Sequence, residues 1–246
     1  KTAEMNRDAF DEDDEHRLLI DVSRGVLGIY EGINGIHQGY NLIIADFPLK
    51  WTVQGMGKLF TTGINNVITN QKVIPAHLMD PKIKNRSRLF YLMANIEASL
   101  FKGENNWPLM LDTDGYIAEG SGDNFFIVKN NTVISPEGRN MLRGISRDYV
   151  MNDLCKTLNI NVIEKNIEPY DVYEADEAFI CATPFCILPV TSLNSLKVGD
   201  GKPGRVFNKL IQLWSKKTGV DIIKQIESWN QEIENTKNKV TPYKFK

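Results

Sequence analysis

The sequence predicts an α+β fold, and three observations support this prediction. Runs of apolar and β-branched residues that are typical of strands lie at residues 18–23, 40–45, 66–68 and 73–75, and glycines separate the first two runs. Apolar residues recur at helical spacing after Pro81, which predicts an amphipathic helix over residues 87–102. Short strand-like runs joined by turn residues then follow, so strands and helices are mixed along the chain.

The second half of the chain predicts two hairpins and two further helices. One hairpin joins residues 108–112 to 116–118, and the other joins 125–129 to 132–135. A helix capped by Ser146 is expected to reach residue 158, strands are expected at 162–163 and within 178–190, and a helix is expected over 203–217. Because Asp80 and Pro81 interrupt the strand pattern, we expect a small α/β domain over residues 1–79 and a larger domain over 80–246.

Composition narrows the function classes. A net charge of -2 gives no strong field to attract nucleic acid or an anionic membrane, and no apolar run approaches the roughly 20 residues that span a bilayer. We therefore expect a cytoplasmic protein with a small-molecule site. The three cysteines, Cys155, Cys181 and Cys186, have no metal-site spacing, and His16, His37 and His77 are scattered, so no metal centre is expected. The acidic run at residues 11–15 is interpreted as a solvated or flexible lead-in without chemistry.

Lys84 and Glu119 are the most informative pair of residues. Lys84 lies in the sequence Pro-Lys-Ile-Lys-Asn-Arg-Ser-Arg-Leu, and Glu119 begins the sequence Glu-Gly-Ser-Gly-Asp-Asn-Phe-Phe. A lysine amine that can form a Schiff base and a carboxylate that can face a pyridine nitrogen are what a protein must supply to pyridoxal phosphate. Taken singly, each residue is better explained as an ordinary surface side chain.

Two further segments could hold a phosphate. The sequence Met-Leu-Arg-Gly-Ile-Ser-Arg at residues 141–147 places two backbone N–H groups and a hydroxyl at a helix N-terminus, where the helix dipole favours an anion. Thr183 interrupts an apolar strand-like run at residues 180–190 and could add a second hydroxyl. Alone, the first segment is better explained as an ordinary capped helix and the second as an ordinary strand threonine.

The order and spacing of these four segments resemble the class IV aminotransferases, the fold-type IV pyridoxal phosphate enzymes. This family includes branched-chain aminotransferases, D-amino acid aminotransferases, (R)-amine transaminases and aminodeoxychorismate lyase. The resemblance runs from about Arg24 to Gly204 and is most specific between Glu119 and Arg147. It implies a small α/β domain beside a larger domain whose β-barrel-like core is flanked by helices. It also implies a homodimer.

The resemblance also implies a role for each site residue. Lys84, rather than Lys82, would be the Schiff-base residue and the general base, because Ile83 precedes it and Glu97-Ala98 ends the following helix. Glu119 would contact the pyridine nitrogen, and Leu142 would pack against the ring. Gly144, Ile145, Ser146 and Thr183 would hold the phosphate of pyridoxal 5'-phosphate.

Two departures from the family pattern affect these expectations. The arginine that binds phosphate in family members lies in a stretch before the segment that resembles residues 18–25, so the small domain is expected to lack its N-terminal part, and Arg24 does not take that role. Pro184 follows Thr183 where many members offer a backbone N–H to a substrate carboxylate, and proline has no such donor.

The function expected is transfer of an amino group between an amino acid or amine, branched-chain-like or (R)-amine-like, and a 2-oxo acid. Two alternatives stay open at this point. One is a lyase of the aminodeoxychorismate lyase type, which the pair Arg88-Leu89 resembles. The other is a family member without catalytic activity that binds a partner.

Overall fold

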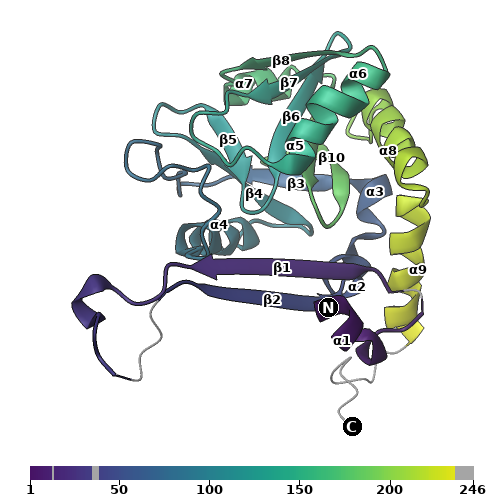
Figure 1. Ribbon diagram of the computed structural model, residues 1–246. Coiled ribbons are helices and arrows are strands. Elements are labelled where there is room, and N and C mark those ends of the chain that lie inside the picture. The colour runs from purple at the N-terminus through teal and green to yellow at the C-terminus, as the bar shows by residue number, and fades with distance from the viewer. Residues whose placement is uncertain (13, 35–38, 236–246) are drawn as a thin grey trace. The chain divides into compact units, whose positions relative to one another are not determined.

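The computed structural model describes residues 1–12, 14–34 and 39–235, shown as ribbons in Figure 1. Asp13, Gly35 and His37, which entered the sequence analysis, lie outside the described residues. The described chain forms two compact units, residues 1–55 with 229–235, and residues 56–228. Within the described residues, no helix combines the length and the apolar character that crossing a bilayer requires.

The smaller unit is built on a two-stranded antiparallel ribbon. Strands β1 and β2 pair from His16 opposite Pro48 to Ser23 opposite Asn41. The elements of this unit are α1 (Thr2–Met5), η1 (Arg7–Ala9), β1 (His16–Ser23), η2 (Gly28–Tyr30), β2 (Asn41–Pro48) and α2 (Lys50–Val53). The strand predictions at residues 18–23 and 40–45 are therefore confirmed.

Two features of this unit differ from the sequence-based interpretation or extend it. The acidic run is not a free lead-in, because the Lys50 ammonium lies 2.6 Å from Asp14 and 3.2 Å from Asp11. One face of the ribbon is apolar and exposed, since Ile20 lies opposite Ile44 and both side chains face solvent. This face follows from the alternation of side chains along a strand.

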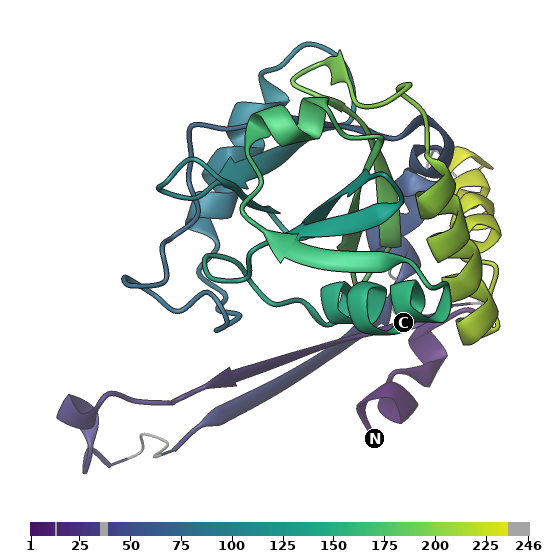
Figure 2. The same ribbon diagram turned by 90° about the horizontal axis from the view of Figure 1, so that it is seen from above.

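The larger unit is a six-stranded mixed barrel. Its strands follow the order β3, β4, β5, β6, β9 and β10, and β10 closes the ring by pairing with β3. The ring opens toward the viewer in Figure 2. Strands β7 and β8 extend it beyond β6, and β11 pairs with β10. The strands are β3 (Ile64–Ile68), β4 (Asn106–Leu111), β5 (Ile117–Gly120), β6 (Asn124–Lys129), β7 (Thr132–Pro136), β8 (Asn161–Lys165), β9 (Glu177–Ala182), β10 (Cys186–Leu193) and β11 (Leu196–Lys197).

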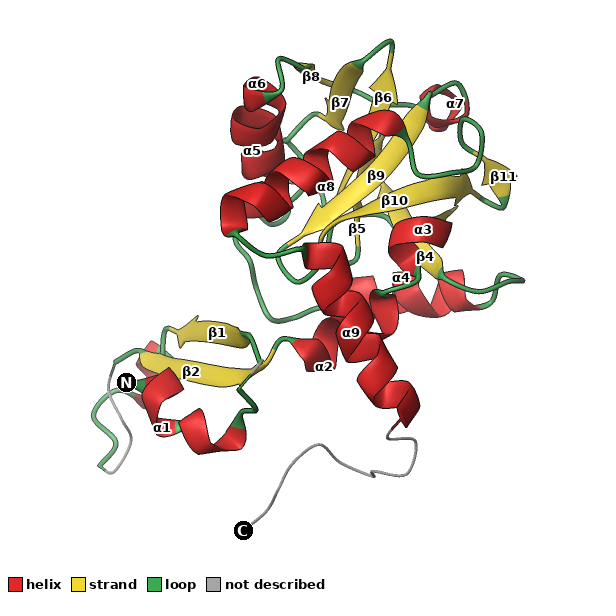
Figure 3. Ribbon diagram, turned by 90° about the vertical axis from the view of Figure 1, so that its right-hand side faces the viewer, coloured by secondary structure: helices red, strands yellow, loops and turns green. Residues whose placement is uncertain are grey.

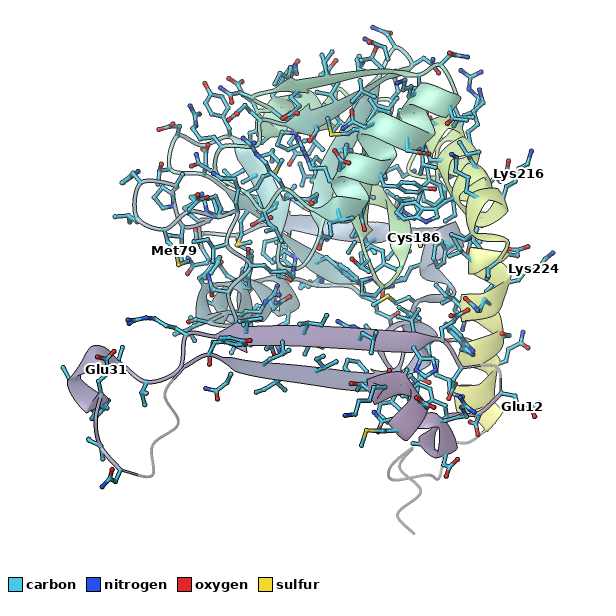
Figure 4. All side chains as sticks on the ribbon, in the orientation of Figure 1. Glu12, Glu31, Met79, Cys186, Lys216 and Lys224 are labelled. Atoms are coloured by element: carbon cyan, nitrogen blue, oxygen red, sulfur yellow. The ribbon has the colours of Figure 1, made fainter. Side chains whose placement is uncertain are left out.

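Helices cover the outside of the barrel. Helix α8 packs against β9 and β10, and α4 packs against β4 (Figure 3). The polar side chains of α8 face outward, as Lys216 does in Figure 4. The remaining helices are η3 (Gln54–Met56), α3 (Leu59–Thr62), α4 (Leu89–Ser99), α5 (Ile145–Tyr149), the π-helix η4 (Val150–Leu154), α6 (Cys155–Thr157), α7 (Pro169–Tyr173), α8 (Arg205–Thr218) and α9 (Ile222–Asn235).

The barrel strands read as nearly continuous apolar runs because both of their faces are covered. Phe125 and Phe126 on β6, and Phe179 on β9, are fully buried. The rings of Phe126 and Phe179 stack with their centroids 4.9 Å apart. The predicted α+β class and the barrel-like core are confirmed.

Three details of the sequence-based prediction need correction. Residues 73–75 form no strand, and the run 178–190 is two strands joined by a turn at residues 183–185. Helix α9 was not anticipated. Residues 56–79, which the sequence analysis assigned to the small domain, belong to the larger compact unit, because β3 pairs in parallel with β4 and β10. The domain division of the protein stays a prediction.

Candidate active site

One end of the barrel brings together residues that are far apart in the sequence. Glu119, next to the end of β5, pairs with Asn124 at the start of β6, and Asn124 pairs with Cys181 near the end of β9. The turn between β5 and β6 and the turn between β9 and β10 therefore lie at the same end. The candidate site is built on this rim.

Glu119 is a buried carboxylate with a defined set of donors. Only 5% of the surface of Glu119 is exposed to solvent. The hydroxyl of Tyr91 on α4 donates to Oε1 at 2.7 Å, and the backbone N–H of Leu142 donates to Oε2 at 3.1 Å. Each oxygen keeps a lone pair that can accept a further hydrogen bond.

The electrostatics of Glu119 follow from this setting. Burial raises its pKa to about 7, against the opposing effects of the Tyr91 and Leu142 hydrogen bonds and of the positive charges of Lys84 and Arg88. Burial and the nearby Glu119 carboxylate raise the pKa of Tyr91 well above its usual range. Tyr91 is therefore a neutral hydrogen-bond donor at physiological pH.

The segment before α5 is fixed to the rim through Leu142. Its N–H donates to Glu119, and its carbonyl accepts a hydrogen bond of 2.8 Å from Nδ2 of Asn124. Gly144 follows, and a Cβ atom at this position would lie 2.3 Å from Oδ1 of Asn124. Only glycine therefore allows the chain to pass this close to β6 before the helix begins.

Helix α5 begins at Ile145, with Gly144 as its N-cap. The predicted cap, Ser146, instead lies inside the first turn, where its side chain is buried, whereas Ile145 is exposed. The backbone N–H groups of Ile145 and Ser146 both lie in the first turn, where no carbonyl of the helix can accept a hydrogen bond from them. The buried Arg147 anchors the turn by donating 2.9 Å from Nε to the Ser135 hydroxyl.

Lys84 lies in the loop between β3 and α4, and its side chain is exposed. Hydrogen bonds within the loop shape it: the Lys82 N–H donates to Oδ1 of Asp80 at 3.0 Å, and the Asn85 amide contacts Sδ of Met79, labelled in Figure 4, at 3.5 Å. The Lys82 ammonium forms an ion pair with Asp80 at 2.8 Å, which lowers the pKa of Asp80. Lys84, in contrast, acts electrostatically on Glu119.

Thr183 lies in the turn between β9 and β10 and is exposed. Helix α5 packs against β9, so this turn and the start of α5 belong to the same rim. The structure therefore brings Glu119, Leu142 and Gly144 into one hydrogen-bonded and packed group. Ile145, Ser146 and Thr183 lie beside that group, and Lys84 approaches Glu119 from the loop.

The sequence analysis did not place three residues in this group. Tyr91 and Asn124 hold Glu119 and Leu142, as described above. Arg88 donates to the carbonyl of Ser121, and its guanidinium lies 4.7 Å from the centre of the Tyr91 ring. Asn124 could have been found from the sequence, because a short turn between the two predicted strands places it opposite Glu119. No local sequence pattern indicates that Tyr91 contacts Glu119.

Comparison with known sequences identifies the family. The family model described as "Amino-transferase class IV" matches residues 3–193. The branched-chain-amino-acid aminotransferase of Escherichia coli K12 is 31% identical over 174 residues, which cover 70% of this chain and 55% of that protein. The corresponding enzyme of Pseudomonas aeruginosa is 39% identical over 102 residues, or 42% of this chain and 33% of that protein. The chain thus spans about half the length, or less, of these relatives.

Comparison with solved structures agrees. The crystal structure of the Escherichia coli branched-chain amino acid aminotransferase matches with a TM-score of 0.70 and 29% identity, covering 82% of this chain and 64% of that one. A second branched-chain amino acid aminotransferase, solved with pyridoxamine 5'-phosphate from the source abbreviated T.th., matches with a TM-score of 0.70 and 25% identity, covering 87% and 68%. Together with the family model, which covers most of the chain, these matches show that the chain belongs to the class IV aminotransferases.

Proposed function

We propose that this chain carries the cofactor site of a pyridoxal 5'-phosphate-dependent aminotransferase. The proposed reaction moves an amino group between a 2-oxo acid and an amino acid or amine of the branched-chain or (R)-amine type. Family membership and relatives named branched-chain aminotransferases support this proposal. A cytoplasmic location and a homodimer stay predictions.

Glu119 is the single observation that carries the proposal. A buried carboxylate with both oxygens hydrogen-bonded, and with its pKa raised to about 7, is set up to accept one more donor. A pyridine N–H is such a donor, so the residues present fit the cofactor. When bound, the cofactor supplies an aldehyde that binds amines covalently and a ring that accepts electrons.

The remaining residues take roles that their positions allow. Lys84 Nζ would provide the covalent attachment point and take the proton from Cα of the amino donor. The half-buried Leu142 side chain would pack on the ring face. The phosphate would bind to the backbone N–H groups of Ile145 and Ser146 in the first turn of α5 and to the Thr183 hydroxyl. Gly144, which has no side chain, would leave room for it.

Covalent trapping tests the proposal and the choice of lysine. The protein is mixed with pyridoxal 5'-phosphate, reduced with borohydride and digested, and the modified peptide is identified by mass spectrometry. We expect the label on Lys84, its loss in Lys84→Ala, and its retention in the matched control Lys82→Ala. A label on Lys82, or no specific label, would contradict the proposal and favour a member of the family without catalytic activity.

An assay with and without a 2-oxo acid separates transfer from elimination. A transaminase needs the amino acceptor for turnover, whereas a lyase releases keto acid without one. Arg88, whose pairing with Leu89 resembles the lyase branch, has a structural explanation here: it binds the Ser121 carbonyl and stacks on Tyr91. We therefore expect turnover only with the acceptor present.

A further inference from the structure

Asn140, in the loop between β7 and α5, joins three segments of the larger unit. Only 8% of its surface is exposed. Its Oδ1 accepts a hydrogen bond of 3.1 Å from the backbone N–H of Ala76, in the loop between β3 and α4 that also contains Lys84. Its Nδ2 donates at 3.2 Å to Oδ2 of Asp112, the residue that follows β4. One buried amide therefore connects the lysine loop, the segment before α5 and the end of β4.

The orientation of this amide is fixed by its partners. A backbone N–H can only donate and a carboxylate oxygen can only accept, so the oxygen of Asn140 must face Ala76 and its nitrogen must face Asp112. Asp112 is itself held in place, because its Oδ1 accepts hydrogen bonds of 3.0 Å from the backbone N–H groups of Asp114 and Tyr116. The bridge through Asn140 therefore starts from a fixed point at the turn between β4 and β5.

Successive turns lead from Ala76 to Lys84. One closes where the Leu78 N–H donates to the Pro75 carbonyl at 2.9 Å, and another closes at residues 80–83 with a hydrogen bond of 3.0 Å. Because these turns are short and follow one another, a shift of the backbone at Ala76 also moves the residues after it. The hydrogen bond from Ala76 to the Asn140 side chain therefore helps to set where Lys84 lies.

The segment on the other side of the bridge has anchors of its own. Leu142 binds both the Glu119 carboxylate and the Asn124 amide, and Arg147 donates to the hydroxyl of a β7 serine. These contacts do not involve Asn140. Loss of the bridge should therefore release the lysine loop more than it disturbs the start of α5.

We propose that Asn140 is a positioning residue, whose amide holds the Lys84 loop at a fixed place relative to the segment before α5. This inference rests on the proposed function, in which that segment binds the ring and phosphate of the cofactor while Lys84 forms the covalent bond. Asn140 acts through the loop and does not touch the cofactor. Misplacing a reacting group by about 1 Å can cost roughly 100-fold in reaction rate, so covalent attachment should depend on the bridge more strongly than non-covalent binding does.

Exchanging the donor and acceptor of the bridge tests the proposal. Asn140→Asp removes the donor to Asp112 and places a second carboxylate beside it, and Asp112→Asn leaves a donor facing a donor. The double variant restores both hydrogen bonds: the new amide at position 112 donates to the new carboxylate at position 140, which still accepts from Ala76. Arg139→Ala, at an exposed position in the same loop, is the matched control.

Amide hydrogen exchange of the protein without cofactor measures the bridge directly. We expect the Ala76 amide to be protected in the wild type and to exchange about tenfold faster in each single variant, because a buried hydrogen bond is lost. The double variant and Arg139→Ala should behave like the wild type. An unprotected Ala76 amide in the wild type would overturn the proposal without any variant having to fold, and so would a double variant that exchanges as fast as the single ones.

Cofactor binding separates positioning from general support of the rim. Trapping of pyridoxal 5'-phosphate at Lys84 should fall about tenfold in the single variants and recover in the double variant, while pyridoxamine 5'-phosphate, which has no aldehyde, should lose less than about threefold in affinity. Equal losses for both compounds, or no loss for either, would overturn the proposal. Absence of trapping in the wild type would instead refute the proposed function, and hydrogen exchange would still decide whether Asn140 holds the loop.

Discussion

The two ends of the proposed cofactor site are built in different ways. Glu119 belongs to a barrel strand, is 5% exposed and has its oxygens fixed by Tyr91 and Leu142. Lys84 belongs to a loop, is exposed, and depends on short-range turns around Asp80 for its position. The glutamate end is therefore part of the folded core, whereas the lysine end can change without disturbing that core. This difference can be tested by comparing effects on chemistry with effects on stability.

The largest expected effect on chemistry is at the lysine end. Lys84→Ala should abolish covalent cofactor attachment and lower transamination by about 10²–10⁴-fold, because it removes both the attachment point and the base. Since the side chain is exposed, the free energy of unfolding should change by only about 0.5 kcal/mol. Absorbance of the bound cofactor and denaturant titration measure the two effects. A large loss of stability would mean that Lys84 supports the fold.

The glutamate end should instead make stability depend on pH. The pKa of Glu119 is raised from 4.5 to about 7, so between these values the folded protein binds more protons than the unfolded chain. The free energy of unfolding should therefore fall as pH rises through this window, by up to about 3 kcal/mol from this group. Glu119→Gln should reduce that slope and leave the contribution of Asp123, whose pKa burial likewise raises to about 7, as measured by denaturant titration at several pH values.

Glu97 provides a control with the opposite sign. Burial alone would raise its pKa, but hydrogen bonds from Gln71 and Asn70 outweigh burial and lower it. Its contribution to stability is therefore present above the ordinary glutamate pKa and is lost as pH falls below it. Glu97→Gln should leave the slope between pH 4.5 and 7 unchanged. Equal slopes in the wild type and Glu119→Gln would show that Glu119 is not the group responsible.

The contrast between the two ends also explains what could be predicted from sequence. Strand runs such as residues 125–129, and the helix before which Lys84 lies, are local patterns, and the structure contains them as β6 and α4. Val73 and Ile74 look like a strand for the same local reason. The backbone N–H of Val73 donates a hydrogen bond to the Leu111 carbonyl. Pro75 has no backbone N–H, so it cannot donate a hydrogen bond to a neighbouring strand.

The partners of Glu119 depend on long-range register, which local patterns do not contain. Tyr91 reaches Glu119 from a helix 28 positions earlier, and Asn124 meets it because β5 and β6 pair across a short turn. The start of α5 is a similar case. Ser146 has the residue type of a helix cap, yet the close approach of Gly144 to Asn124 sets the helix start two residues earlier.

A smaller effect separates two polar residues of the rim. Asn124→Ala removes the donor to the Leu142 carbonyl at a buried position, so unfolding should become easier by about 1–3 kcal/mol. Thr183→Ala affects an exposed turn and should change stability by about 0.5 kcal/mol or less, while weakening cofactor binding about tenfold. Denaturant and cofactor titrations of both variants test this. Equal losses of stability would remove the distinction between core and rim.

The smallest expected effect concerns Pro184, beside Thr183 in the same turn. Proline offers no backbone N–H, so Pro184→Ala introduces a donor at the position where the family resemblance implies a contact with a substrate carboxylate. One added hydrogen bond of about 1 kcal/mol corresponds to roughly a fivefold lower KM for a 2-oxo acid. An amine donor without a carboxylate serves as the internal control, and its KM should not change. A parallel change for the amine and the 2-oxo acid would mean that the substitution alters the turn itself, and the carboxylate would then have to be recognised elsewhere on the rim.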